Sequence, residues 1–287
     1  MDDGRLSGMR ADVTVAPPDG VLWSYDCAWA DLLVPVSLAD GLEELDLADG
    51  WSRRWTATWS SGRGPVSCVV RDLARTSVLE GGSTRWFSWR RSQRHRPGLH
   101  FLVSTGRHHG AESLEEARVL LALDFAGGVV DVIAQPVKFG FDAGGKRRAH
   151  TPDFLAVTRA GVWLVDVRPK ALIKRSDLEA FAAAAEIAAA CGWHYVVAAQ
   201  WRENVAAAVD AFSSQRRALS DPLGLRPGLL EAARRGGTFG ELADATSVPP
   251  VARAQLLHLL WHRQVGVDLS RSFGDASFVV RSTGPGL

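Results

Sequence analysis

Two short motifs near the middle of the chain could together hold a divalent metal ion. Pro152-Asp153 and Asp166-Val167-Arg168 place their aspartates thirteen residues apart, on strands predicted to form one hairpin. Carboxylate oxygens suit Mg²⁺ or Mn²⁺, and a metal beside a phosphodiester supports nuclease chemistry. Taken alone, the first motif is more simply a turn before a strand, and the second an ion pair at a strand end. Their pairing across a hairpin favours the metal site.

A third carboxylate and a cation could complete this site. Glu116 lies on a helix predicted over 113–125 and could join the metal ligands. It is also the reciprocal residue of a capping box that begins at Ser113, and spacing does not choose between the two roles. Arg168 should point the same way as Asp166, because side chains on one face of a strand repeat every second residue. It could neutralise charge on the transition state.

The elements expected to position these residues alternate between helices and strands. After the helix 113–125, with Leu114 in its apolar stripe, strands are predicted over 129–133 and 137–141. A strand running through Asp153 to Val157 and another over 162–167 follow. An alanine-rich helix over 176–190, capped by Ser176, a strand over 195–199 and a helix over 203–217 complete the pattern. This order predicts an α/β fold, a mixed sheet with helices on its faces.

The N-terminal part of the chain differs in composition. Residues 1–20 are predicted to be an acidic, disordered leader, and residues 21–104 a Trp-rich region with strands near 55–59 and 66–70. Between residues 85 and 96, five arginines alternate with three aromatic side chains. Arg90, Arg91 and Arg94 could therefore grip nucleic-acid phosphates, although an edge strand with solvated arginines explains them equally well.

The C-terminal part is predicted to be a small domain after a linker at 221–228. Three helices, over 229–235, 238–245 and 249–263, precede a hairpin built from 265–269 and 276–281. Three helices followed by a β-wing are typical of a winged helix, with Arg253 and Arg263 on the helix that would contact DNA. A small helical domain that binds protein is the alternative. The domains expected are thus 1–20, 21–104, 105–220 and 229–282.

Charge and cysteine usage suggest the chain's surroundings and partners. Residues 1–50 carry eleven acidic and two basic side chains, a net charge of −9, so the remainder carries +10. This asymmetry favours a protein that binds a polyanion, to which a basic loop could contribute Lys146, Arg147 and Arg148. Three scattered cysteines form neither a disulfide framework nor a zinc pattern, as expected in a reducing cytoplasm. We expect no signal peptide and no membrane association.

The motifs resemble those of one known family in order and spacing. Ser113-Leu114-Glu115-Glu116, Leu123-Asp124-Phe125, Gln135-Pro136, Thr151-Pro152-Asp153-Phe154 and Asp166-Val167-Arg168-Pro169 follow one another as in TnsA-type endonuclease subunits of heteromeric transposases. Those subunits belong to the PD-(D/E)xK nuclease superfamily. The resemblance covers roughly residues 105–200, and the region 229–282 also resembles the second domain of TnsA proteins.

The resemblance implies a restriction-endonuclease-like core and an Mg²⁺-dependent endodeoxyribonuclease that Mn²⁺ would also support. It implies metal binding by Glu116, Asp153 and Asp166, and cleavage of double-stranded DNA at transposon 5′ ends. The implied partners are an integrase-like transposase subunit and an AAA+ ATPase.

Arg168 stands where the family has its catalytic lysine. Arginine stays charged and does not act as a base. Lys170, two residues further on, is a candidate to contribute in its place. A catalytically inactive DNA-binding or assembly subunit, and a stand-alone resolvase or repair nuclease, remain alternatives.

Overall fold

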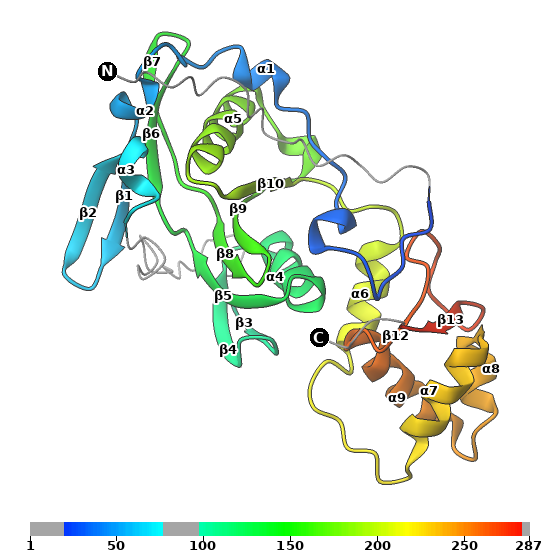
Figure 1. Ribbon diagram of the computed structural model, residues 1–287. Helices are drawn as coiled ribbons and strands as arrows, with labels where there is room; N and C mark the ends of the chain where they lie inside the picture. The colour runs from blue at the N-terminus through cyan, green and yellow to red at the C-terminus, as the bar shows by residue number, and fades with distance from the viewer. Residues whose placement is uncertain (1–19, 77–97, 283–287) are drawn as a thin grey trace, which may run out of the picture.

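The computed structural model describes residues 20–76 and 98–282, and its centre is a four-stranded mixed sheet (Figure 1). The strand order is β10-β9-β8-β5, with β9 and β10 parallel and the other neighbours antiparallel. The strands are β5 (Val129–Ala134), β8 (Phe154–Thr158), β9 (Gly161–Val167) and β10 (His194–Ala198). The predicted hairpin between β8 and β9 is confirmed.

One helix covers each face of this sheet. Phe154 and Val165 pack in the same apolar cluster as α4 (Leu114–Ala126), whereas Leu155 and Leu164 pack with α5 (Arg175–Ala190). All four strand residues are fully buried. A strand buried on both faces needs apolar residues at consecutive positions, which explains these apolar runs. The expectation of a sheet with helices on its faces is confirmed.

A second sheet joins the Trp-rich segment to the central region. Its order is β2-β1-β6-β7, with β1 (Thr56–Ser61), β2 (Gly64–Val69), β6 (Lys138–Ala143) and β7 (Lys146–His150). Because β1 pairs directly with β6, the described part of 21–104 is not a separate body. A strand running through Asp153 is predicted from the sequence, but Asp153 lies in the break between β7 and β8. The chain leaves the second sheet at His150 and enters the central one at Phe154.

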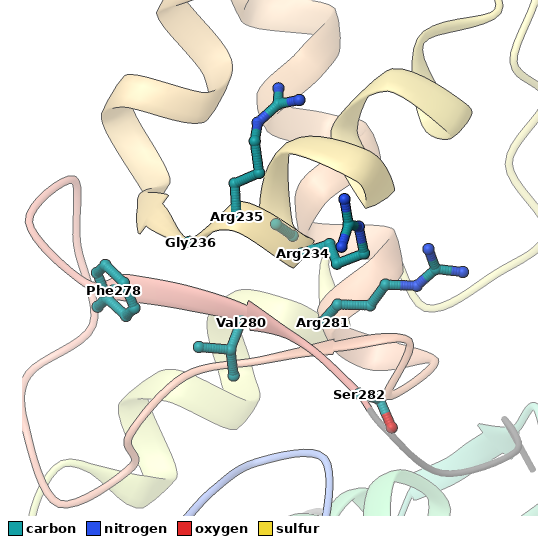
Figure 2. Close-up of a pocket in the computed structure, with 8 residues that line it drawn as sticks. Arg234, Arg235, Gly236, Phe278, Val280, Arg281 and Ser282 are labelled. Carbon is teal, nitrogen blue, oxygen red and sulfur yellow. The ribbon is translucent and has the colours of Figure 1, made fainter.

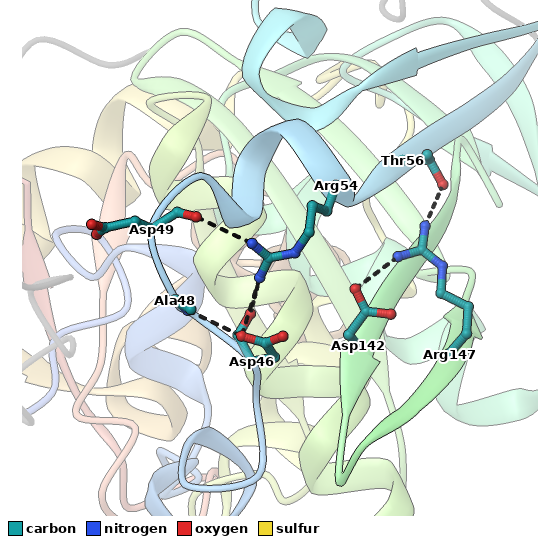
Figure 3. Close-up of polar contacts among 7 residues, drawn as sticks. All are labelled: Asp46, Ala48, Asp49, Arg54, Thr56, Asp142 and Arg147. Atoms are coloured by element: carbon teal, nitrogen blue, oxygen red, sulfur yellow. Dashed lines mark hydrogen bonds and ion pairs between the residues drawn. The ribbon is translucent and has the colours of Figure 1, made fainter.

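Short elements and polar contacts close the outer side of the second sheet. Arg54 donates to the carbonyl of Asp49 and pairs with Asp46, while Arg147 pairs with Asp142 and donates to Thr56 (Figure 3). Arg54 thus ties the acidic stretch to α2, and backbone hydrogen bonds from Asp46 N–H to Asp142 O and from Gly144 N–H to Glu44 O hold that stretch against β6 and the turn after it. The short elements of this region are α1 (Ala39–Leu42), α2 (Trp51–Arg54) and α3 (Val70–Leu73), whereas η1 (Trp29–Leu32) and the two-stranded sheet of β3 (Gly98–Leu102) and β4 (Arg107–Ala111) pack with α4.

The C-terminal part has three helices and a three-stranded sheet of order β11-β13-β12. Asp221 accepts the backbone N–H groups of Leu225 and Arg226, so α7 begins at Leu225, inside the segment predicted as a linker. Pro227 does not prevent this, because the first turn of a helix tolerates proline. The elements are α7 (Leu225–Arg235), β11 (Gly237–Thr238), α8 (Phe239–Asp244), α9 (Pro249–Trp261), β12 (Val265–Gly266) and β13 (Phe278–Arg281), and helix α6 (Val205–Ser213) lies between β10 and this part of the chain.

The segment after residue 20 ties the C-terminal part to the central one. Ser24 exchanges hydrogen bonds with Val267, and Leu22 accepts the N–H of Leu269. The guanidinium of Arg263 donates to carbonyls of both the N-terminal segment and α4. One apolar cluster therefore runs from Cys27 to Val279 across the predicted domain boundaries.

Sequence signals for the helix starts succeeded at α4 and failed at α5. Ser113 caps α4 as predicted, but Leu114 is 74% exposed rather than part of the apolar stripe. Helix α5 begins at Arg175, where Asp177 accepts the N–H of Lys174, so Ser176 is not its cap. Among the described residues no helix is long and apolar enough to cross a membrane. This part of the chain forms a mixed α/β protein with several small sheets and nine α-helices.

Candidate active site

Asp153 and Asp166 meet at one end of the β8–β9 hairpin. Phe154 pairs with Val165, so extending the register by one residue places Asp153 opposite Asp166. The backbone N–H of Asp153 donates to Val165 O at 3.0 Å, and Val167 N–H donates to Asp153 Oδ2 at 2.7 Å. The position of Asp153 is therefore fixed through both its main chain and its carboxylate. The structure brings the two predicted aspartates together.

Two side chains that the sequence analysis did not single out hold Asp166. His150 Nε2 lies 2.8 Å from Asp166 Oδ1, and the hydroxyl of Tyr195 donates to Oδ2 at 2.7 Å. Asp166 itself is 1% exposed. A buried carboxylate is tolerated when its oxygens are hydrogen-bonded, which explains both partners. The side chain of Asp166 is thus held in one orientation.

The crowding of carboxylates changes the protonation of this site. Burial raises the pKa of Asp153 well above its ordinary value, and repulsion from Asp166 and then from Glu116 adds to the effect. Burial opposes the charging of His150, but the nearby carboxylates, Asp166 first, outweigh it and raise its pKa. The pKa of Tyr195 is raised by burial and by Asp166, so it remains a hydrogen-bond donor. Asp153 is therefore the carboxyl group of this site that ionises with difficulty.

Glu116 contributes to this field while serving the start of α4. Its Oε2 accepts the N–H of Glu112 at 2.7 Å, and its Oε1 lies 3.0 Å from the hydroxyl of Ser113. The capping function foreseen from the sequence is confirmed, with its reciprocal bond directed to Glu112. In the described ranges, no group of three or more His, Cys, Asp or Glu side chains is arranged to hold a metal ion.

Arg168 lies one residue beyond the end of β9 and pairs with an acid other than Asp166. Its Nε lies 3.3 Å from Asp177 Oδ2, on the first turn of α5, and the side chain is 39% exposed. Its backbone N–H donates to Ala198 O at the end of β10. Lys170 begins the short 3-10 helix η3 (Lys170–Leu172) and is exposed. Both cations lie just beyond the carboxylate pair along the chain.

The predicted DNA-contacting residues have diverse surroundings. The residues predicted as a basic loop lie on strand β7, where Lys146 is exposed, Arg147 pairs with Asp142, and Arg148 pairs at 2.9 Å with the buried carboxylate of Glu179. Arg148 therefore links β7 to α5 rather than projecting freely.

In the C-terminal part, Arg253 pairs with Asp275 and with Asp244, and its guanidinium lies over the ring of Phe239. Arg263 lies beyond α9 and is engaged by backbone carbonyls, so its placement is explained by packing. Arg90, Arg91 and Arg94 lie outside the described residues.

The residues that the sequence analysis missed had a weak local signal. His150 stands three residues before Asp153, and Tyr195 is the one polar residue of a predicted buried strand over 195–199. A polar side chain in an otherwise apolar strand needs a buried partner, and Asp166 is that partner. Asp177 lies at the start of a predicted helix, where an acidic residue is explained by helix capping, so its pairing with Arg168 was not expected.

The chain matches no protein-family model and no curated protein. Its function must therefore be inferred from the residues and their geometry.

Proposed function

We propose that this protein is a metal-dependent DNA endonuclease subunit of a heteromeric transposase, of the TnsA-like kind that its motifs resemble. The observation that carries the proposal is the meeting of Asp153 and Asp166 at the end of β8 and β9, beside the negative charge of Glu116. Mutual repulsion among neighbouring carboxylates is relieved by a cation, and oxygen ligands suit Mg²⁺.

The arrangement of elements around the pair supports a restriction-endonuclease-like core. A helix precedes three antiparallel strands, and a second helix leads to a strand parallel to the third, in the order α4, β5, β8, β9, α5, β10. Strands β6 and β7 are an excursion between β5 and β8. The sequence α7, β11, α8, α9, β12, β13, with β13 between the other two strands, likewise supports a winged-helix-like unit.

Asp153 and Asp166 would hold Mg²⁺ or Mn²⁺, which would polarise the scissile phosphate and lower the pKa of an attacking water. Other residues of the chain would orient these carboxylates and stabilise charge. Tyr195 and His150 orient Asp166, and the N–H of Val167 orients Asp153. Arg168 leaves its ion pair with Asp177 and places its positive charge near the phosphate. There it stabilises the negative charge of the transition state without accepting a proton. Lys170 adds a second cation on the exposed side.

The proposed substrate is double-stranded DNA at transposon 5′ ends, and the proposed partners are an integrase-like transposase subunit and an AAA+ ATPase. The motif resemblance supports these assignments, as does the net charge of +10 carried beyond residue 50. The exposed Lys146 lies on β7, the strand that ends at His150.

Nicking of supercoiled plasmid and branched DNA by the purified chain with Mn²⁺ tests this function. We expect nicking by wild type, and its loss in Asp153→Asn and Asp166→Asn. Asp49→Asn serves as the control, because Asp49 is exposed and its carboxylate lies outside the site. If wild type binds DNA without nicking it, or if Asp153→Asn nicks at the wild-type rate, the proposal fails.

One observation favours a second candidate, a catalytically inactive DNA-binding or assembly subunit. Arg168 stands in the lysine position and is paired with Asp177. Under this alternative, Arg168→Lys would leave the protein inactive. Under the nuclease proposal it would preserve or increase cleavage.

A further inference from the structure

A concave surface outside the carboxylate site lies between the last turn of α7 and strand β13 (Figure 2). It encloses about 410 Å³, within the roughly 300–1000 Å³ typical of small-ligand sites. We call it the arginine groove and define it by Arg234, Arg235, Phe278 and Arg281.

Positive charge dominates the groove. Arg234 and Arg235 come from α7 and are 63% and 68% exposed, and Arg281 comes from β13. Figure 2 shows Arg234 and Arg281 extending toward the same side of the groove. Stabilisation of a helix C-terminus explains arginines in the last turn of α7, but not a third one from a neighbouring strand.

One carboxylate partly balances these three guanidinium groups. Glu231 pairs with Arg234 at 2.9 Å and lies 3.9 Å from Arg235. A hydrogen bond from Arg234 lowers the pKa of Glu231, and the charges of Arg235 and Arg281 lower it further. All three arginines therefore surround a single acid and leave two positive charges uncompensated.

An exposed aromatic ring, Phe278, lies at the other end of the groove from Arg281 (Figure 2). Phe278 is 54% exposed, although its neighbour Val279 on β13 is fully buried. Gly236 adopts φ +81°, and a Cβ there would come within 2.6 Å of the ring. The glycine thus lets Phe278 lie against the chain while more than half of the residue remains open to solvent.

We propose that the arginine groove binds a short single-stranded DNA segment, with one base stacked on Phe278 and its flanking phosphates on the arginines. Guanidinium forks match phosphate oxygens, and an exposed aromatic ring gives a base a stacking surface that duplex DNA cannot use. An acidic peptide would satisfy the arginines but has no counterpart for the ring. The choice of DNA rests on the proposed function, because strand cleavage by a transposase exposes single strands.

Fluorescence anisotropy with labelled oligo-dT in EDTA tests this binding without any contribution from a metal or from cleavage. Changing all three groove arginines to glutamine should reduce the slope of log Kd against log salt by about 1.4, because two phosphates are no longer neutralised and each contributes roughly 0.7 to the slope. Phe278→Ala should weaken binding roughly tenfold, and Phe278→Trp should restore it. The changed side chains are exposed, and a thermal melt verifies folding.

Matched controls separate the groove from general charge. Arg53, Arg63 and Arg159 are exposed and lie elsewhere, so changing all three to glutamine removes equal charge. The proposal is overturned if this control loses as much affinity as the groove variant, or if Phe278→Ala binds like wild type. It is also overturned if hexaglutamate competes as well as oligo-dT, which would indicate an acidic protein partner. Groove binding in an Asp153→Asn protein that cannot nick would support the groove independently of the nuclease.

Discussion

Replacing Asp153 with asparagine should stabilise the metal-free protein at neutral and alkaline pH. Asparagine keeps an oxygen that can accept the N–H of Val167. It removes one charge from a buried cluster in which burial, Asp166 and Glu116 all raise the pKa of Asp153. Each unit of that elevation corresponds to about 1.4 kcal/mol of unfolding free energy. Because the elevation is large, we expect Asp153→Asn to gain at least ~1 kcal/mol at pH 8.

The dependence of this gain on pH identifies its cause. A carboxyl group whose pKa is raised by folding contributes stability below its unfolded pKa, near 3.8, and loses it as pH rises through the folded value. The difference between variant and wild type should therefore be small near pH 3.8 and grow toward pH 8. Urea denaturation in EDTA across this range measures it, with Asp49→Asn as a control expected to stay within about 0.5 kcal/mol of wild type. A variant that is less stable than wild type at pH 8, or a pH-independent difference, would refute the reasoning.

Three further outcomes follow from the same contacts. Tyr195→Phe removes the hydroxyl that donates to the buried Asp166, so urea denaturation should show a free energy of unfolding lower by about 1.5–3 kcal/mol. The affinity for Mn²⁺, measured by calorimetry, should fall about 10–100-fold. An unchanged affinity would count against the role of Tyr195 in positioning Asp166. Arg168→Lys should support Mn²⁺-dependent nicking at least as fast as wild type in a plasmid assay, and a slower variant would show that the planar guanidinium is needed. In Arg263→Lys, an ammonium replaces a guanidinium that donates to three carbonyls, so the free energy of unfolding should fall by about 1–3 kcal/mol. DNA binding should not weaken. Weakened DNA binding at unchanged stability would support the predicted DNA contact of Arg263 instead.

The hairpin that unites the two aspartates is predictable because its signals are local. A tight turn at 158–161 fixes the register of β8 and β9, and the register alone places Asp153 opposite Asp166. The cap of α4 by Ser113 is equally local. Motif spacing is informative wherever a short stretch of chain determines the geometry.

The remaining features depend on contacts between distant parts of the sequence. No local pattern shows that β1 pairs with β6, so the sequence alone predicts a separate Trp-rich region. Arg263 resembles a DNA contact in the sequence because its three carbonyl partners come from segments more than a hundred residues away. Tyr195 is one residue of a buried strand in the sequence, and only the parallel pairing of β10 with β9 brings it to Asp166.

The central claim is that Asp153 and Asp166 share a divalent metal ion. Anomalous diffraction from a Mn²⁺-soaked crystal of the full chain tests it most directly. We predict a manganese peak within about 2.0–2.5 Å of oxygens from both carboxylates, lost in crystals of Asp153→Asn. A soaked crystal with both aspartates ordered and no peak between them would contradict the account.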